Sequence, residues 1–120
     1  MAESHTLGKR GEQIAEKLLE SKGFKIRERN WRTGKREIDL IAENISTVVF
    51  AEVKTRTAGF QVDPRDAVTA PKQRNLIFAA ETYVKRNGIE KEIRFDIITL
   101  VADGRSFRTE HIEDAFYPTL

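Results

Sequence analysis

Two stretches of the chain repeat apolar residues with the period of about 3.6 that is typical of a helix with one buried face. The first is residues 6–22, with Thr6 as the N-cap residue and Gly23 just beyond the C-terminus. The second follows Thr69, again an N-cap residue, and ends at Gly88. Its predicted buried face holds Leu76, Ala79, Ala80, Tyr83 and Val84. Residues 1–5 precede the first helix, and we expect them to form a flexible tail.

Five further segments are rich in β-branched and aromatic residues and predict strands. They are residues 24–31, 37–42, 47–55 and 93–102, and a short last strand at 106–112. Turn residues separate several of them, and a loop is expected over residues 58–65. The order α-β-β-β-α-β with a last strand predicts an α/β (α+β) fold, in which two helices flank a central mixed sheet. The 120 residues are enough for one domain.

Composition excludes several classes of chemistry. Without cysteine, the chain has no disulfide, no thiolate metal site and no cysteine nucleophile. The longest apolar run, residues 76–80, is far shorter than the roughly 20 residues that cross a membrane. The first residues lack the apolar stretch of a signal peptide. We therefore expect a cytoplasmic protein that does not bind membranes.

Charge is distributed unevenly, although the formal net charge is only +2. Residues 1–36 hold ten basic and five acidic side chains, whereas residues 87–120 hold four basic and seven acidic ones. The basic end suits a polyanion such as nucleic acid, which basic side chains bind by releasing its counterions. Because an ordinary soluble surface is also highly charged, charge alone leaves both interpretations open.

The predicted strands at 37–42 and 47–55 carry the polar residues of greatest chemical interest. Side chains on a strand alternate between faces, so Glu52 and Lys54 share a face. Asp39 lies on the same face if the two strands pair in an odd register, in which the residue numbers of each directly opposed pair add up to an odd number. The same register forms one apolar face from Ile38, Leu40, Ala42, Val49, Ala51 and Val53. A slip by one residue would expose this core, so we predict that Asp39, Glu52 and Lys54 converge.

Two converging carboxylates repel each other unless a cation lies between them. Their oxygen atoms suit Mg²⁺ or Mn²⁺, and such an ion activates water and polarises a phosphoryl oxygen. Lys54 is then placed to stabilise developing negative charge or to orient the water. The alternative is a solvated polar stripe on a hairpin. The strand of Glu52 is predicted to be central, where charges need a partner, and both interpretations stay open.

Several motifs, taken together, resemble a known family. Asp39 followed by Glu52-x-Lys54 resembles the PD-(D/E)XK nuclease signature, with Ile38 in place of the proline and with Lys35-Arg36 between Gly34 and Glu37. The whole chain resembles the YraN-like family of small bacterial proteins, which are similar to archaeal Holliday-junction resolvases. The matching stretches are Gly8-x-x-Gly11-Glu12-x-x-Ala15, Asn30-Trp31-Arg32, residues 37–41, residues 49–56, Ala67-Val68, Lys72-Gln73-Arg74 and Arg94-Phe95-Asp96.

The resemblance implies a restriction-endonuclease-like αβββαβ core and a metal-dependent DNA endonuclease or resolvase-like activity, with branched DNA as one substrate. It implies that Asp39 and Glu52 bind Mg²⁺ or Mn²⁺, to which we add the Val53 carbonyl, and that Lys54 is the catalytic lysine. It also implies that Glu12 approaches from the first helix and Gln73 from the second. Resolution of four-way junctions needs two active sites and hence a homodimer.

Six basic residues are candidates for phosphate contacts: Arg29, Arg32, Lys35, Arg36, Arg56 and Lys72. Two other functions stay open. One is a nucleic-acid-binding module that has the nuclease fold with little or no catalysis, and the other is a protein-interaction adaptor that uses the acidic C-terminal third. Asp96 either assists the site or pairs with Arg94, and His111 is assigned no role.

Overall fold

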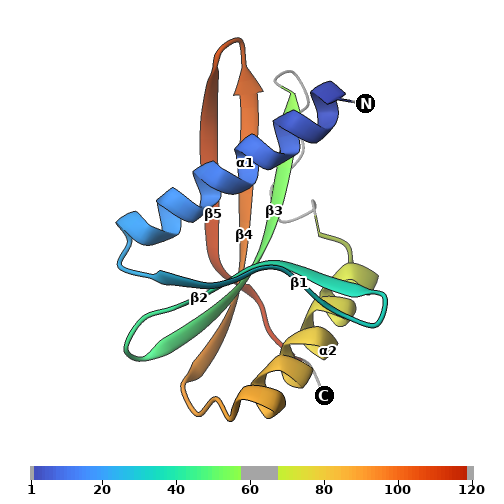
Figure 1. The fold of residues 1–120 in the computed structure, drawn as a ribbon, viewed down its shortest axis with the longest axis vertical. Helices are drawn as coiled ribbons and strands as arrows, with labels where there is room; N and C mark the ends of the chain where they lie inside the picture. The colour runs from blue at the N-terminus through green and yellow to red at the C-terminus, as the bar shows by residue number, and fades with distance from the viewer. Residues whose placement is uncertain (1, 58–67, 119–120) are drawn as a thin grey trace.

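The computed structural model describes residues 2–57 and 68–118, which form two helices and five strands (Figure 1). In chain order they are α1 (Ala2–Ser21), β1 (Lys25–Thr33), β2 (Arg36–Glu43), β3 (Thr47–Thr57), α2 (Ala70–Asn87), β4 (Glu92–Asp103) and β5 (Ser106–Phe116). The strands form a single sheet in the order β1-β2-β3-β4-β5. The predicted α+β class and order of elements are confirmed. The loop expected at 58–65 lies outside the described residues.

Neighbouring strands are antiparallel except for β3 and β4, which run parallel and are joined through α2. The predicted odd register of β2 and β3 is confirmed, because Leu40 pairs with Ala51 and Ala42 pairs with Val49. β3 pairs with β4 along its whole length, from Thr47 to Thr57. The strand that carries Glu52 and Lys54 is therefore central, as predicted.

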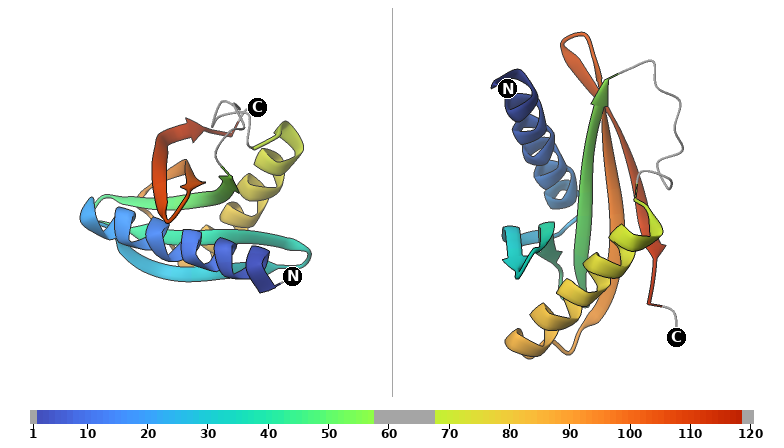
Figure 2. Two further views of the ribbon diagram at one scale, coloured as in Figure 1. Left: turned by 90° about the horizontal axis from the view of Figure 1, so that it is seen from above. Right: turned by 90° about the vertical axis from the view of Figure 1, so that its right-hand side faces the viewer.

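The sheet separates two hydrophobic cores, and one helix covers each face (Figure 2). On one face α1 buries Ala15 and Leu19 against Leu40, Ala42, Val49, Ala51, Ile98 and Leu100. On the other face α2 buries Leu76, Ala79, Ala80 and Tyr83, with Val84 partly buried beside them. Thr69 and Gly88 cap α2 as predicted, since the Thr69 side chain accepts a hydrogen bond from the Lys72 N–H and Gly88 has a φ of +60°.

Ile38 is the exception to the predicted apolar face. It was expected beside Leu40 and Ala42, but it lies in the α2 core. Regular alternation is interrupted at Asn30, which lies between the β1 residues paired with Leu40 and Ile38 and has a φ of +50°. Beyond this position Trp31 and its partner Ile38 both face α2.

Two elements extend further than the sequence pattern predicts. α1 begins at Ala2 instead of Thr6, so residues 2–5 belong to the helix. No glycine or proline precedes Gly8, and alanine and glutamate favour helices. β5 ends at Phe116 instead of residue 112, because Phe116 stacks on Phe95 with 5.1 Å between the ring centroids.

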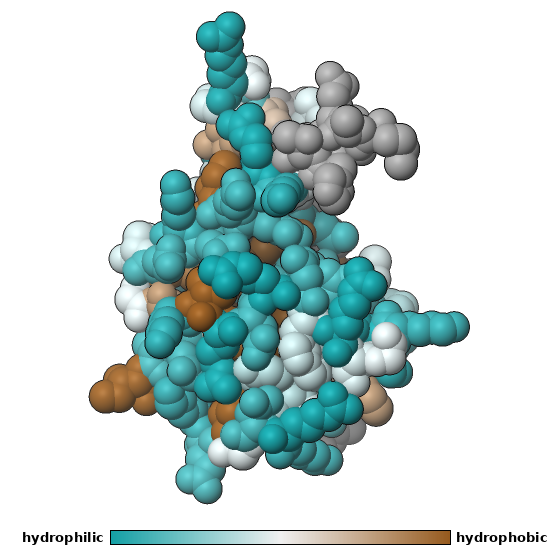
Figure 3. Space-filling model, viewed as in Figure 1, coloured by the Kyte–Doolittle hydropathy of each residue, from teal (hydrophilic) through white to brown (hydrophobic). Residues whose placement is uncertain are grey.

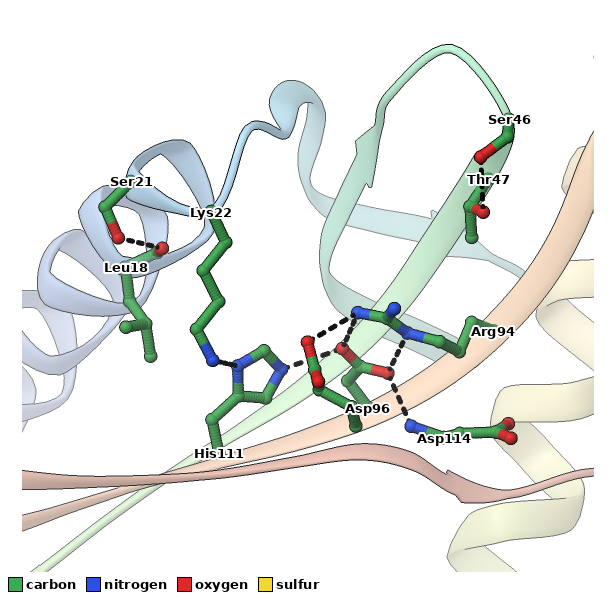
Figure 4. A network of polar contacts seen from close by, with 10 residues as sticks. Leu18, Ser21, Lys22, Ser46, Thr47, Arg94, Asp96, His111 and Asp114 are labelled. Carbon is green, nitrogen blue, oxygen red and sulfur yellow. Dashed lines mark hydrogen bonds and ion pairs between the residues drawn. The ribbon is translucent and has the colours of Figure 1, made fainter.

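A buried polar network joins β4, β5 and the residue after α1 (Figure 4). Asp96 is fully buried and accepts hydrogen bonds from Arg94 Nε at 2.9 Å, from His111 Nε2 at 2.7 Å and from the Asp114 N–H at 3.0 Å. Lys22 Nζ donates to His111 Nδ1 at 2.8 Å. Burial by itself would raise the pKa of Asp96, but these hydrogen bonds outweigh it and lower the pKa. Of its two proposed roles, the pairing of Asp96 with Arg94 is confirmed.

The surface in the view of Figure 1 is mostly hydrophilic, and its apolar side chains form small separate patches (Figure 3). Across the described residues, the large apolar side chains that remain exposed are Ile45, Phe78, Ile93 and Tyr117. Neither α1 nor α2 is both long enough and apolar enough to cross a membrane.

Candidate metal and nucleic-acid site

The candidate site lies where β2 and β3 stop pairing. The last pair is Leu40 with Ala51, and Asp39 and Glu52 are the next residues along each strand. From this point the β1–β2 hairpin turns away from β3 (Figure 1). The Val53 N–H donates to Asp39 Oδ2 at 2.9 Å, so the Asp39 side chain spans the opening between the strands. The backbone thus holds both acids where the sheet opens.

Glu52 is the most enclosed acid of the site, with a side chain that is 4% exposed. Its Oε1 atom lies 3.5 Å from Lys72 Nζ and 3.9 Å from Lys54 Nζ. Its Oε2 atom is buried and has no hydrogen-bond partner among the described residues. Burial and then the Asp39 charge raise the pKa of Glu52 to about 7, against the opposing effect of the two lysines. Such a carboxylate gains from any cation that reaches Oε2.

Asp39 is in a similar but better satisfied environment. Burial raises the pKa of Asp39, and the hydrogen bond from Val53 acts in the opposite direction. The charge of Glu37 raises this pKa further, whereas Lys72 and Lys54 lower it. The structure thus brings together Asp39, Glu52 and Lys54, and it adds Lys72 from the first turn of α2.

Gln73, the other polar residue expected here from α2, points elsewhere. Its Nε2 atom donates to the Val68 carbonyl oxygen at 3.2 Å, just before the N-terminus of its own helix. Lys72, which precedes it, is the α2 residue that contacts Glu52. The sequence pattern placed Lys72 among the phosphate-binding residues and did not indicate this ion pair.

Glu12 approaches from α1, on the opposite side of the sheet from Lys72. The Asn30 side chain donates to Glu12 Oε2 at 3.3 Å and to Glu37 Oε1 at 3.0 Å. Burial raises the pKa of Glu12, the Asn30 hydrogen bond opposes this, and the Asp39 charge adds to it. Sequence reasoning gave Asn30 no role. The available signal was its residue type, because asparagine tolerates the left-handed backbone better than most residues.

Gly11 sets the distance between α1 and β3. It is buried, and a Cβ atom built on it would overlap Thr55 Oγ1. Thr55 directly follows Lys54 on β3, so the close approach at Gly11 also determines where Glu12 lies. A Cβ atom on Gly8, one turn earlier in α1, would meet nothing within 4 Å.

The predicted phosphate-binding residues form two groups. Three of them make ion pairs with acids outside the Asp39–Glu52 pair: Arg29 with Glu16 at 2.8 Å, Arg32 with Glu37 at 3.0 Å, and Arg56 with Glu110 at 3.8 Å. The other group surrounds the β1–β2 turn and the start of α2: Lys35, Arg36 and Lys72. Exposed ion pairs are weak, so the pairs of Arg29 and Arg32, whose side chains are 58% and 73% exposed, contribute little to stability.

The donor atoms fit a hard divalent cation. Asp39 and Glu52 supply two neighbouring carboxylates, and the buried Glu52 Oε2 has no partner in the described part of the chain. Over residues 2–57 and 68–118, no group of three or more histidine, aspartate or glutamate side chains is placed to hold a metal ion. A cation here would therefore take these two carboxylates together with backbone or water oxygen, for which the Val53 carbonyl is the predicted ligand.

The model of the family described as "Uncharacterised protein family UPF0102" matches residues 11–100, a segment that contains Glu12, Asp39, Glu52, Lys54 and Lys72. The chain belongs to the UPF0102 family. A UPF0102 protein of Bacteroides fragilis is 46% identical over 120 residues, and one of Phocaeicola vulgatus is 44% identical; both alignments cover 100% of this chain and 99% of the relative. A UPF0102 protein of Porphyromonas gingivalis is 43% identical, over 97% of this chain and 87% of the relative. The YraN-like resemblance is confirmed.

Proposed function

We propose that this UPF0102 protein is a metal-dependent nuclease that hydrolyses phosphodiester bonds in DNA. The proposal is carried by the buried Glu52 carboxylate, which lies beside Asp39 where β2 and β3 diverge and has one oxygen without a hydrogen bond. Lys54 and Lys72 add two cations to the same carboxylate. Acids that attract a metal ion and lysines that attract a phosphate are thus found in one place.

Each residue has a distinct task in this mechanism. Asp39 and Glu52 would hold the ion together with the Val53 carbonyl, and bound Mg²⁺ or Mn²⁺ supplies Lewis acidity and an activated water. Lys54 is 44% exposed, so its ammonium group is accessible to a phosphate and stabilises the negative charge that develops there. Lys72 is 43% exposed and offers a second ammonium group from α2.

A cleavage assay tests the proposal directly. Single-stranded, duplex, flap and four-way-junction DNA are incubated with the protein in Mg²⁺ and in Mn²⁺. We expect cutting that is lost in Glu52→Gln. It should be retained in Glu43→Gln, the same substitution at an acid that pairs with Arg27 at the other end of β2. Equal cutting by both variants would contradict the catalytic role of Glu52. Preferred cutting of junctions would indicate a homodimer, because resolution needs two active sites.

A nucleic-acid-binding module without catalysis is the second candidate. It is favoured by the pairing of Glu52 with Lys72 and by the absence of a three-acid cluster within the described ranges. Thermal unfolding separates the two functions, because a bound ion stabilises the folded state. For a nuclease, millimolar Mg²⁺ or Mn²⁺ raises the Tm of the wild type and not that of Asp39→Asn. For a binding module, salt-dependent DNA binding occurs without this Tm increase and without cleavage.

A further inference from the structure

An exposed aromatic ring stands beside the candidate site on α2. Lys72, Asn75 and Phe78 are three residues apart, a spacing that forms one ridge along a helix surface. Lys72, at one end of the ridge, contacts the Glu52 carboxylate at 3.5 Å. Phe78, at the other end, is about 9 Å further along the helix axis. A single strand that binds at Glu52 and follows α2 therefore passes Phe78.

Arg36 connects the β1–β2 hairpin to this ridge. Its Nε atom donates to Asn75 Oδ1 at 3.3 Å, and its guanidinium carbon lies 4.1 Å from the centroid of the Phe78 ring. Figure 1 shows the tip of this hairpin next to the N-terminal half of α2. The same hairpin carries Asp39. It therefore connects the Phe78 ring, through Arg36, to the Asp39 carboxylate of the candidate site.

The Phe78 ring is available to a ligand even with Arg36 stacked on it. The residue is 52% exposed, whereas Leu76 and Ala79 on the same helix are buried. Of the other exposed large apolar side chains in the described residues, Ile45 and Ile93 are aliphatic and offer no flat π surface, and Tyr117 is aromatic but follows the end of β5, away from α2 in the sequence. Phe78 combines a π face with the adjacent guanidinium plane of Arg36, and the charge of Lys72 lies on the same ridge of α2.

We propose that Phe78 and Arg36 form a stacking platform for an unpaired nucleobase, so that the preferred substrates are nucleic acids with single-stranded nucleotides next to the scissile phosphate. The inference rests on the proposed nuclease function and names its substrate class. Aromatic rings and arginine planes stack on splayed bases, because every base has a π face. A base inside a duplex is covered on both faces by its neighbours. The surrounding cations complement the phosphates of the same strand.

Equilibrium binding without cleavage tests the platform. Fluorescein-labelled single-stranded and duplex oligonucleotides of equal length are titrated with protein in EDTA. Phe78→Ala is expected to weaken single-strand binding about tenfold and to change duplex binding less than twofold. Ile45→Ala removes an exposed apolar side chain at the β2–β3 turn and should change neither affinity. Phe78→Trp should retain single-strand affinity, and its added fluorescence should be quenched by the single strand and not by the duplex.

The outcomes separate this inference from the proposed nuclease. Equal effects of Phe78→Ala on both nucleic acids, no effect on either, or no binding by the wild type would overturn the platform. Metal-dependent cleavage that Phe78→Ala leaves unchanged would keep the nuclease and reject the platform. If Phe78→Ala selectively loses single-strand binding but the wild type cleaves no DNA, the platform is supported as part of a binding module and the nuclease is rejected.

Discussion

Replacing Glu52 by glutamine should stabilise the folded protein at neutral and alkaline pH in the absence of metal. The ordinary pKa of this glutamate is 4.5, and burial together with Asp39 raises it to about 7 in the folded state. Each step of one in pKa corresponds to about 1.4 kcal/mol. Ionised Glu52 therefore lowers the free energy of unfolding by about 3 kcal/mol above pH 7. For a domain of this size that corresponds to a Tm difference of roughly 10 °C.

The sign of the pH dependence follows from the same shift. Between pH 4.5 and 7 the unfolded chain has lost the Glu52 proton while the folded chain retains it, so the wild type loses stability as pH rises. Glu52→Gln has no proton to lose. Its advantage over the wild type should be small at pH 4.5, grow through pH 6 and level off above pH 7.

The assay is urea or thermal unfolding in EDTA at pH 5, 6, 7 and 8, with Glu43→Gln as the matched control. The Arg27 hydrogen bond lowers the pKa of Glu43, so this acid stabilises the fold when it is ionised. Glu43→Gln should therefore be less stable than the wild type at pH 7, the opposite of Glu52→Gln. If Glu52→Gln is destabilised at pH 8, or if its advantage is equal at pH 5 and pH 8, the electrostatic account of the site is wrong.

Further predictions concern the packing of α1 and the buried network. Gly11→Ala should destabilise the protein, because the added Cβ overlaps Thr55, whereas Gly8→Ala should stabilise it by roughly 0.5–1 kcal/mol through helix propensity. Chemical denaturation of both variants checks this, and the double variant Gly11→Ala with Thr55→Ala should recover stability. Equal effects at both glycines would contradict the prediction. Asp96→Asn should cost about 3 kcal/mol or more at pH 7, because it removes the fully buried carboxylate charge that pairs with Arg94 and His111. The lowered pKa of Asp96 means that its contribution is lost in acid, so the variant and the wild type should converge in stability as pH falls below about 4.

The fold was largely predictable because its signals are local or periodic. Caps at Thr69 and Gly88 mark the ends of α2, and the β2–β3 register follows from the apolar residues on one face. The convergence of Asp39 with Glu52 follows from that register alone. The face of Ile38 was predicted wrongly, because the alternation on β2 breaks between Leu40 and Ile38, opposite the left-handed Asn30 of β1.

Contacts between distant elements were the part that sequence could not supply. Lys72 and Gln73 are adjacent on a helix, and only the rotation of α2 against the sheet decides which of them reaches Glu52. His111 appears on a late strand with no motif around it, yet it is 4% exposed and hydrogen-bonded to Asp96. Arg36 and Phe78 are 42 positions apart in the sequence, and their contact depends on the direction in which the hairpin leaves β3.

The parallel pairing of β3 with β4 also constrains how the chain folds. The other strand neighbours are joined by short turns, but β3 and β4 pair residues that are 45 positions apart, such as Thr47 with Glu92. Closing a loop of that length lowers the chain entropy before any stabilising contact forms, so non-local strand pairing is slow. We therefore expect the β1–β2–β3 meander and the β4–β5 hairpin to form first and to dock late. Since β3 carries Glu52 and Lys54 while α2 carries Lys72, the complete site appears only when the two halves join. Partly folded chains lack it.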